Sequence, residues 1–339
     1  ITREYIIING KAVPSHSIEN REVQDISGAL ETVSVEWWAG DGSGTDYAEA
    51  YDNYGRNIRY HQVVHEIGEL GGIYEGLERT TVTDWWAGVN ENGEIDSSQA
   101  WTAVGGFLKS YYQKTRVNTK VYDVVTGEEL ETLDLTTTTI RKDMQYYAQT
   151  DESKGFYAGQ LKSYTEIIIS SSSPGKTTEN SVRGITYNEK GWIKYSISRI
   201  TERGEGLNHT YTIETTVTKF NSYGQVLRRK EVITNDNACP AKTVTKESIE
   251  DIQYDGYGRL VYSKDYIKEE GANLGHTYDI ETKITSYNRL DQILRQTQII
   301  TNDSACPDKT ATFTDLKDRK YNKDGLLIYT YTETKEQDL

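Results

Sequence analysis

The feature that most constrains this chain is an internal repeat of 67 residues, in which His209 matches His276 and Cys239 matches Cys306. Each repeat contains two copies of a turn signature, Tyr-Asn/Asp-x-x-Gly. The signatures begin at Tyr187, Phe220, Tyr254, Tyr287 and Tyr321, in steps of 33, 34, 33 and 34 residues. A fixed period of about 20 to 50 residues is typical of arrays in which each unit packs on its neighbours. We therefore expect a repeat array with 33/34-residue half-units.

The residues between the turns predict two antiparallel strands in each half-unit. Ile193, Tyr195 and Ile197 alternate with polar residues, which is the period of a half-buried strand. Thr-rich, β-branched runs also favour strands, and helical patterns are hard to find. The sequence predicts an all-β fold, a tandem β-hairpin array that forms either an extended meander or a solenoid-like sheet. Stacking of the units is expected to place equivalent residues side by side.

Three regions of the chain differ in regularity. Residues 187–339 carry the regular hairpin repeats, and residues 116–186 carry divergent β repeats. In residues 1–115 a Trp-rich segment, Val33–Gly40, recurs as Val82–Gly88, 48 positions later at the paired Trp. Because the terminal units of a repeat array are usually atypical, residues 1–115 are predicted to form an irregular N-terminal β cap region.

Composition excludes several classes of protein. Apolar residues make up 35% of the chain, but 26 tyrosines separate it from disordered acidic sequences, so it should fold with a thin core. The net charge of −14 argues against binding to nucleic acid or to anionic lipid. No apolar run approaches the roughly 20 residues of a membrane span. The first residue is Ile1 rather than Met, so we expect either a processed mature form or a fragment of a longer protein, and the start favours export.

The turns resemble the YD repeat of the Rhs and teneurin families. The residues that carry the resemblance are Tyr51-Asp52-Asn53-Tyr54-Gly55-Arg56 and Tyr254-Asp255-Gly256-Tyr257-Gly258-Arg259-Leu260. Phe220 and Asp291, which replace the Tyr and the Gly of two turns, depart from the pattern. The resemblance implies an exported bacterial protein, often at the cell surface, whose β-sheet strip winds into an encapsulating shell. Nothing in the chain resembles the toxin that ends such polypeptides.

The sequence offers no catalytic set, and we expect no enzyme activity, no cofactor and no metal. His61, His65 and Glu66 superficially suggest a zinc protease. In the zinc-protease motif, however, the two His lie on a helix and the Glu directly follows the first of them, whereas Glu66 follows the second. Here they fall on a predicted strand. The segment 41–46 has the composition of a calcium loop without its completing acidic residue, so we interpret it as a hairpin loop.

The two cysteines lie in matching loops of successive repeats, at Cys239 and Cys306. In a four-strand meander they would lie about 19 Å apart and could not bond, whereas stacked solenoid coils would bring them within about 5 Å. Pairing with another chain is a third alternative. Exposed thiols of exported proteins seldom stay reduced, so we favour a disulfide of some kind for Cys239 and Cys306.

Trp37 and Trp85 are equivalent residues of the N-terminal repeat and could stack on sugar rings. Because adjacent residues of a strand point to opposite faces, at least one Trp of each Trp-Trp pair is expected in the core. This hypothesis makes the protein a carbohydrate-binding cell-surface adhesin with a polysaccharide partner.

The preferred hypothesis is mechanical. A repeat sheet leaves unpaired backbone groups at its edges, and apolar strands near both ends of this chain could pair with another copy. The predicted assembly edges are Tyr5, Ile6, Ile7 and Ile8 at one end and Leu327, Tyr329 and Tyr331 at the other. We therefore expect an extracellular structural protein, a fibre subunit that self-associates end to end into a homopolymer. The adhesin is the alternative, and an Rhs-like shell fragment comes third.

Overall fold

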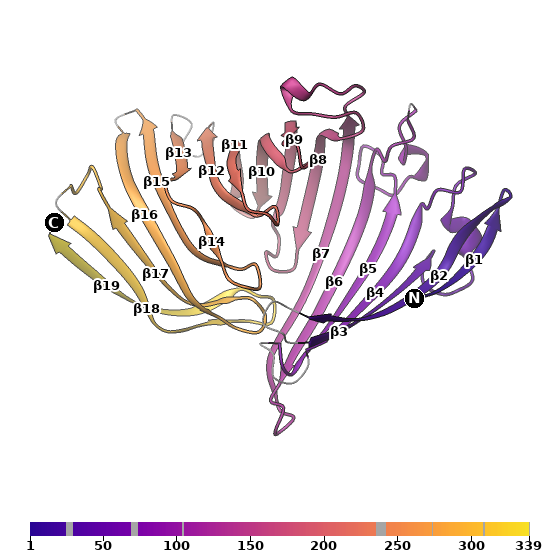
Figure 1. Ribbon diagram of the computed structural model, residues 1–339, viewed down its shortest axis with the longest axis horizontal. Coiled ribbons are helices and arrows are strands. Elements are labelled where there is room, and N and C mark those ends of the chain that lie inside the picture. The colour runs from indigo at the N-terminus through magenta and orange to yellow at the C-terminus, as the bar shows by residue number, and fades with distance from the viewer. Residues whose placement is uncertain are drawn as a thin grey trace. The chain divides into compact units, whose positions relative to one another are not determined.

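The structure is a computed structural model that describes residues 1–24, 30–68, 74–103, 105–234, 242–272, 274–307 and 309–338. Within these residues the chain is nearly all β, with nineteen strands and three short 3-10 helices (Figure 1). The strands of the first half are β1 (Thr2–Ile8), β2 (Lys11–Gln24), β3 (Leu30–Ala39), β4 (Arg59–Gly68), β5 (Leu77–Ala87), β6 (Tyr111–Tyr122), β7 (Glu129–Tyr146), β8 (Leu161–Ser170) and β9 (Thr177–Tyr187). Those of the second half are β10 (Ile193–Gly204), β11 (Leu207–Phe220), β12 (Val226–Thr234), β13 (Thr243–Ser248), β14 (Gln253–Tyr254), β15 (Leu260–Gly271), β16 (Leu274–Tyr287), β17 (Ile293–Thr301), β18 (Lys309–Tyr321) and β19 (Leu327–Asp338). The 3-10 helices are η1 (Tyr47–Ala50), η2 (Ser97–Gln99) and η3 (Glu152–Lys154).

The strands form an antiparallel meander within a 19-stranded sheet. Each strand from β1 to β7 pairs with its successor, and the same holds from β9 to β19, except that β13 and the two-residue β14 both pair with β15. One 67-residue repeat therefore contains β10, β11, β12 and the interrupted strand β13–β14, and the next repeat begins at β15. The predicted all-β hairpin array is confirmed, and of its two forms the structure has the meander.

The meander corrects one expectation about the contacts between repeats. Tyr211 lies opposite Ile200 and Ile213 lies opposite Ser198, because each strand is flanked by its hairpin partners. Equivalent strands of successive half-units, such as β10 and β12, are separated by another strand. Equivalent strand residues are therefore not side by side, and the prediction of such ladders is wrong.

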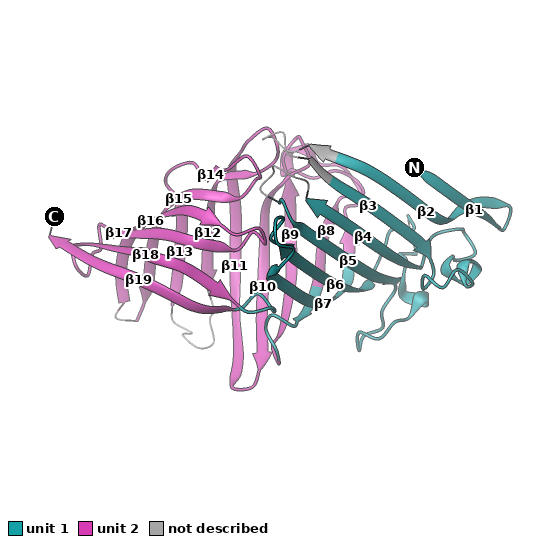
Figure 2. Ribbon diagram, turned by 90° about the horizontal axis from the view of Figure 1, so that it is seen from below, with its two compact units in different colours: residues 1–144, 166–174, 322–326 teal, residues 145–165, 175–321, 327–339 magenta. Residues whose placement is uncertain are grey.

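The chain divides into two compact units, which Figure 2 shows in different colours. Unit 1 contains residues 1–144, 166–174 and 322–326, and unit 2 contains residues 145–165, 175–321 and 327–339. The sequence boundaries at residues 115 and 186 describe the regularity of the repeats and stay predictions.

Unit 1 contains a small apolar core where β1, β2 and β3 meet η1. Val13, Ala39, Ala50 and Tyr51 are buried in it, and Ile6, Ile8, Trp37 and Tyr47 pack around them. The chain reverses between β3 and β4 through η1, whose Ala50 lies in the cluster. The same order of strand, 3-10 helix and isolated β-bridge recurs after β5, with η2 and the bridge from Trp101 to Leu108. The N-terminal sequence repeat is thus a structural repeat.

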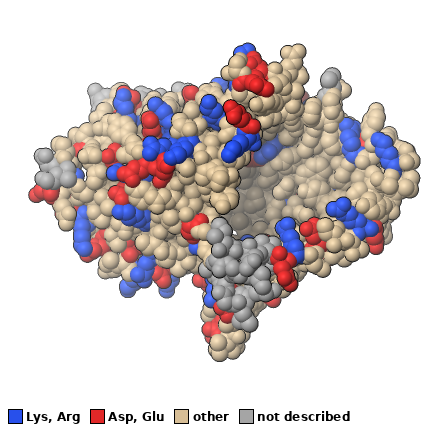
Figure 3. All heavy atoms as spheres, in the orientation of Figure 1, with Lys and Arg blue, Asp and Glu red and all other residues tan. Residues whose placement is uncertain are grey.

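Unit 2 has few fully buried side chains, and its strands are half-buried over most of their length. Cross-strand ion pairs are frequent instead, for example Lys242 Nζ to Glu269 Oε1 at 2.8 Å and Arg203 Nη1 to Glu179 Oε2 at 2.9 Å. Figure 3 shows Lys and Arg interleaved with Asp and Glu over the strands rather than gathered by sign. Surface ion pairs contribute about 0 to 1 kcal/mol each to stability, so the backbone hydrogen bonds between strands and the turns must supply much of the stability of this unit.

No helix among the described residues has the length and apolar character needed to cross a membrane.

Candidate functional site

The Tyr-Asn/Asp-x-x-Gly signature is explained by the turn that it forms. Asp255 Oδ1 accepts hydrogen bonds from the backbone N–H groups of Tyr257 and Arg259, both at 2.9 Å. The backbone N–H of Gly258 donates to the carbonyl of Asp255, and Gly258 has a φ of 81°, which favours glycine. The same side-chain acceptor serves the turns that begin at Asp52, Asn188, Asn221, Asn288 and Asn322.

Long side chains link two successive pairs of turns along one edge of unit 2. In both pairs the residue four positions after the Asp or Asn reaches the glycine position of the following turn. Gln225 Nε2 donates to the carbonyl of Gly258 at 3.4 Å, and Arg259 Nη1 lies 3.3 Å from Asp291 Oδ1. Adjacent turns are two strands apart, about 9.6 Å, which only a long side chain can span.

From Tyr187 onward, each tyrosine that opens a turn also has a fixed partner. Its hydroxyl donates to the carbonyl of the first residue of an earlier strand. The pairs are Tyr187 with Leu161, Tyr254 with Val226, Tyr287 with Leu260 and Tyr321 with Ile293, at 2.8, 2.8, 2.5 and 2.7 Å. Phe220 has no hydroxyl to donate to Ile193, which begins β10. Sequence reasoning placed these tyrosines at the start of the turns and missed the bond, although their recurrence in the signature was the available signal.

The predicted assembly edges lie on the first and the last strand. β1 pairs with β2, β19 pairs with β18, and no described strand pairs with the other side of either. Tyr5 and Ile7 are exposed by 56% and 68%, whereas Ile6 and Ile8 pack against the core of unit 1. The side chains of β19 that were named as an edge, Leu327, Tyr329 and Tyr331, are all exposed.

Trp37 and Trp85 lie on the same face of unit 1, but their rings belong to a ladder. Tyr60 lies between them, with its ring centroid 6.2 Å from that of Trp37 and 5.1 Å from that of Trp85, and Tyr111 follows 6.2 Å further on. The Tyr60 and Trp85 rings are stacked at 17°. Because rings that stack on one another cover each other's faces, little of the interior of the ladder is open to a sugar. The glycan-stacking role of Trp37 and Trp85 stays a prediction.

The structure describes the remaining predicted site residues except Cys239. Cys306 is exposed, whereas Cys239 lies outside the described residues, as does the proposed disulfide. His61 lies on β4, with Nδ1 2.7 Å from Asp84 Oδ1, and His65 contacts the hydroxyl of Thr80 on the neighbouring strand. The described part of the chain contains no group of three His, Cys, Asp or Glu placed to hold a metal ion.

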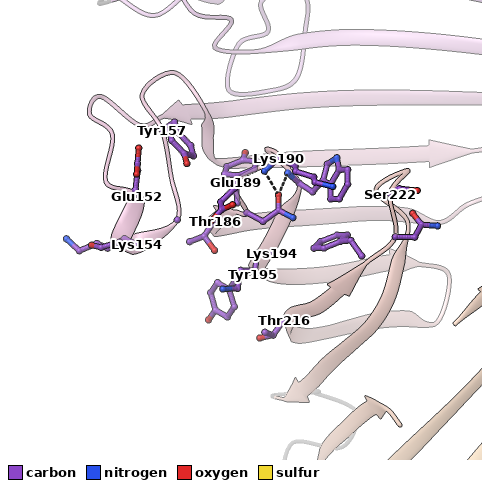
Figure 4. Close-up of a pocket in the computed structure, with 17 residues that line it drawn as sticks. Glu152, Lys154, Tyr157, Thr186, Glu189, Lys190, Lys194, Tyr195, Thr216 and Ser222 are labelled. Atoms are coloured by element: carbon purple, nitrogen blue, oxygen red, sulfur yellow. Dashed lines mark hydrogen bonds between the residues drawn. The ribbon is translucent and has the colours of Figure 1, made fainter. Parts of the chain in front are cut away.

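A large hollow in unit 2 was not anticipated from the sequence. It has a volume of about 1160 Å³ and lies wholly in unit 2, between the segment that contains η3 and the face of β9, β10 and β11. Figure 4 shows Glu152, Lys154 and Tyr157 on one side, and Thr186, Tyr195 and Thr216 on the other. The turn that carries Glu189, Lys190 and Trp192 completes its wall.

Hydrogen bonds and ring packing hold the wall of this hollow in place. Asn188 Oδ1 accepts from the N–H groups of Lys190 and Trp192, both at 3.0 Å. The Trp192 ring lies 5.3 Å from that of Phe220 and fills the space beside Gly224, where an added Cβ would come within 2.9 Å of the indole. The opposite segment is tied to β9 by a bond from the N–H of Tyr187 to the carbonyl of Gly155 at 2.6 Å. The hollow is therefore preformed.

The hollow falls where the repeat departs from its own pattern. Trp192 occupies the position that is Gln225, Arg259 and Gln292 in the following turns, and Phe220 replaces the repeat tyrosine. These two departures were the sequence signal that could have pointed to a site.

A comparison of this chain with protein-family models, with curated proteins and with solved structures finds no match in any of the three.

Proposed function

We propose that this protein is an extracellular structural repeat protein that joins a second copy of itself by β-strand addition between β19 of one copy and β1 of the next. The observation that carries the proposal is the exposure of apolar side chains along these two strands. Of the 21 large apolar residues that are exposed in the described chain, eight lie in or directly beside β1 and β19. The resemblance of the turns to YD repeats is part of the same proposal and supports the extracellular setting.

Backbone chemistry supports strand addition at these edges. An edge strand presents a row of N–H and C=O groups that an incoming strand can satisfy. Proteins usually block such edges with Lys or Pro, yet Leu327–Thr332 contains neither. Lys317 and Lys320 of β18 instead lie over the rings of Tyr331 and Tyr329, at 5.2 and 5.7 Å. Both lysines belong to the neighbouring strand and leave the outer edge of β19 open.

The geometry of such a contact favours an extended polymer. β1 and β19 are different strands, so a contact between them is heterologous and leaves a β19 edge open on the second copy. Repetition of the same contact would add further copies without closing. The turns and strands that form the repeat would then continue from one chain into the next as one sheet.

The test is to place a charge on each edge and to measure the state of association. Sedimentation velocity and negative-stain imaging of the wild-type chain over a wide range of concentrations should show oligomers whose length increases with concentration. Ile7→Lys and Ile328→Lys, at positions exposed by 68% and 64%, should each shift the chain toward monomer because a charged side chain opposes addition of a strand.

Val125→Lys is the matched control. Val125 is 90% exposed and lies between β6 and β7, in the turn rather than on an edge strand. This variant adds the same charge and should associate as the wild type does. The proposal fails if the wild-type chain stays monomeric at every concentration, or if Val125→Lys reduces association as much as the two edge variants.

A further inference from the structure

We infer that the hollow of unit 2 binds an oligosaccharide, through the rings of Tyr157 and Tyr195 and the polar groups around them. This inference is independent of strand addition, because the residues that line the hollow lie on neither β1 nor β19.

Two tyrosine rings in the hollow are free to stack on a ligand. Tyr157 and Tyr195 line the hollow from opposite walls (Figure 4). Among the described residues, neither ring takes part in the ring–ring contacts that join Tyr147 with Phe156 and Trp192 with Phe220 nearby. Tyr195 is also held in place, since its hydroxyl bonds to Glu214 Oε1 at 3.0 Å. A fixed ring with an open face is what the apolar face of a pyranose packs against. The stacked ladder of unit 1, although richer in Trp, offers such faces mainly at its ends.

The hollow is lined by hydrogen-bond donors and acceptors of both charges. Both charges line the hollow, with Lys190 and Lys194 as donors and Glu152 and Glu189 as acceptors. In the described part of the chain, none of these four side chains forms an ion pair, although ion pairs are common elsewhere in unit 2. Lys154 also lines the hollow but pairs with Asp151 Oδ2 at 3.0 Å, and Lys190 Nζ lies 4.9 Å from the centre of the Trp192 ring. Thr186, Thr216 and Ser222 add hydroxyl groups. A ligand with many hydroxyl groups uses donors and acceptors alike, whereas a simple anion or cation would meet repulsion from one of the two pairs.

The hollow is large enough for an oligosaccharide and has a rigid wall. Sites for small ligands usually have volumes of about 300 to 1,000 Å³, so a hollow of about 1160 Å³ has room for several sugar rings. The wall formed by Trp192, Phe220 and Gly224 is packed in place, and a preformed wall reduces the entropy lost when a ligand binds. The two residues that break the repeat, Trp192 and Phe220, thus form the wall rather than contribute open faces.

The experiment is a screen of the intact chain on an array of neutral, acidic and amino-sugar oligosaccharides, followed by calorimetry with the best hexasaccharide. Tyr157→Ala and Lys194→Gln should each weaken its binding by about tenfold or more, and the double variant should abolish it. Thermal unfolding of each variant checks that it is folded.

Two control variants are matched to the test positions. Tyr223→Ala removes an 82% exposed ring from the neighbouring turn, and Lys268→Gln removes a surface lysine of β15 that pairs with Glu270. Both should bind as the wild type does. The inference is overturned if no oligosaccharide on the array binds, or if the bound one is unaffected by Tyr157→Ala and Lys194→Gln in folded protein. Binding that is lost in Trp37→Ala and Trp85→Ala instead would place the sugar on the ladder of unit 1.

Discussion

Arg259 lies across two turns at once. Its Nε atom lies 2.7 Å from Asp255 Oδ2 in its own turn, and its Nη1 atom lies 3.3 Å from Asp291 Oδ1 in the next. Asp291 has a φ of 60°. The other turns of the array have glycine at this position, namely Gly191, Gly224, Gly258 and Gly325, with φ between 76° and 86°. The one turn of the regular array without its glycine is thus the one that receives a guanidinium from its neighbour. The ion pair offsets part of the backbone strain at Asp291.

This relationship predicts an order of stability for variants at position 291. Asp291→Ala should lower the free energy of unfolding by about 1 kcal/mol, because Ala keeps the unfavourable φ, loses the ion pair and has no side chain to bond locally. Asp291→Gly should be neutral or slightly stabilising, because relief of the strain offsets the lost pair. Urea denaturation measures both. A lower stability for Gly than for Ala would contradict this account of the turn.

The tyrosine hydroxyl bonds predict a loss on their removal. Tyr287→Phe should lower the free energy of unfolding by about 1 kcal/mol, since the carbonyl of Leu260 loses its donor at 2.5 Å while the packing of the ring is kept. Tyr254→Phe should behave alike through Val226. Tyr223→Phe is the control, because Tyr223 is exposed and lies outside the pattern. Equal stability of Tyr287→Phe and Tyr223→Phe would show that the bond contributes nothing in solution.

The turns and strands could be predicted from the sequence because their causes are local. Asp255 and Asn288 bond to backbone groups two and four residues away, so the same signature forms the same turn wherever it occurs. The alternation around Ile193 and Tyr195 likewise reports a strand directly. The choice between meander and solenoid was not local, because both are compatible with one hairpin per half-unit.

The candidate site could not be predicted because it depends on contacts between segments that are distant in the sequence. Tyr157 and Tyr195 are 38 residues apart, and only the pairing of β9 with β10 and the anchoring of Gly155 on Tyr187 place them around one hollow. The Trp-rich segments were predicted as a sugar site from their composition and their repetition in the sequence alone. Their register puts Trp37, Tyr60 and Trp85 in one ladder, which the spacing of 48 residues does not reveal.

Acid should weaken the turns that contain an aspartate. Burial acts to raise the pKa of Asp255, but hydrogen bonds from the backbone and the guanidinium of Arg259 outweigh it and lower the pKa below its usual range. A carboxyl whose pKa is lower in the folded state stabilises the protein above its unfolded pKa of about 4, and this contribution is lost as the pH falls through the folded pKa. Asp255→Asn, which keeps the Oδ1 acceptor and loses the charge, should be less stable than the wild type at pH 6. The two proteins should converge in urea denaturation as the pH falls from the unfolded pKa of about 4 through the lower folded pKa of Asp255. A constant difference from pH 6 to pH 2 would refute the role of the charge.

His276 should give the opposite dependence on pH. Its Nε2 atom lies 2.5 Å from Asp303 Oδ1 and its Nδ1 atom 3.4 Å from Glu269 Oε2. The hydrogen bond with Asp303, and then that with Glu269, raises the pKa of His276 above its usual value of 6.5. A histidine whose pKa is higher in the folded state stabilises the protein fully below its unfolded pKa, and this contribution is lost as the pH rises through the folded pKa.

The difference in stability between the wild type and His276→Gln should therefore be largest near pH 5.5 and should shrink above pH 7. Thermal unfolding at half-unit steps of pH measures it. Asp303→Asn removes the stronger partner of His276 and should reduce this dependence of stability on pH. A double variant with His276→Gln and Asp303→Asn should show the same dependence of stability on pH as His276→Gln alone over the same pH range. A difference that grows as the pH rises would mean that the neutral imidazole, rather than the imidazolium, is the form that Asp303 and Glu269 hold in the folded chain.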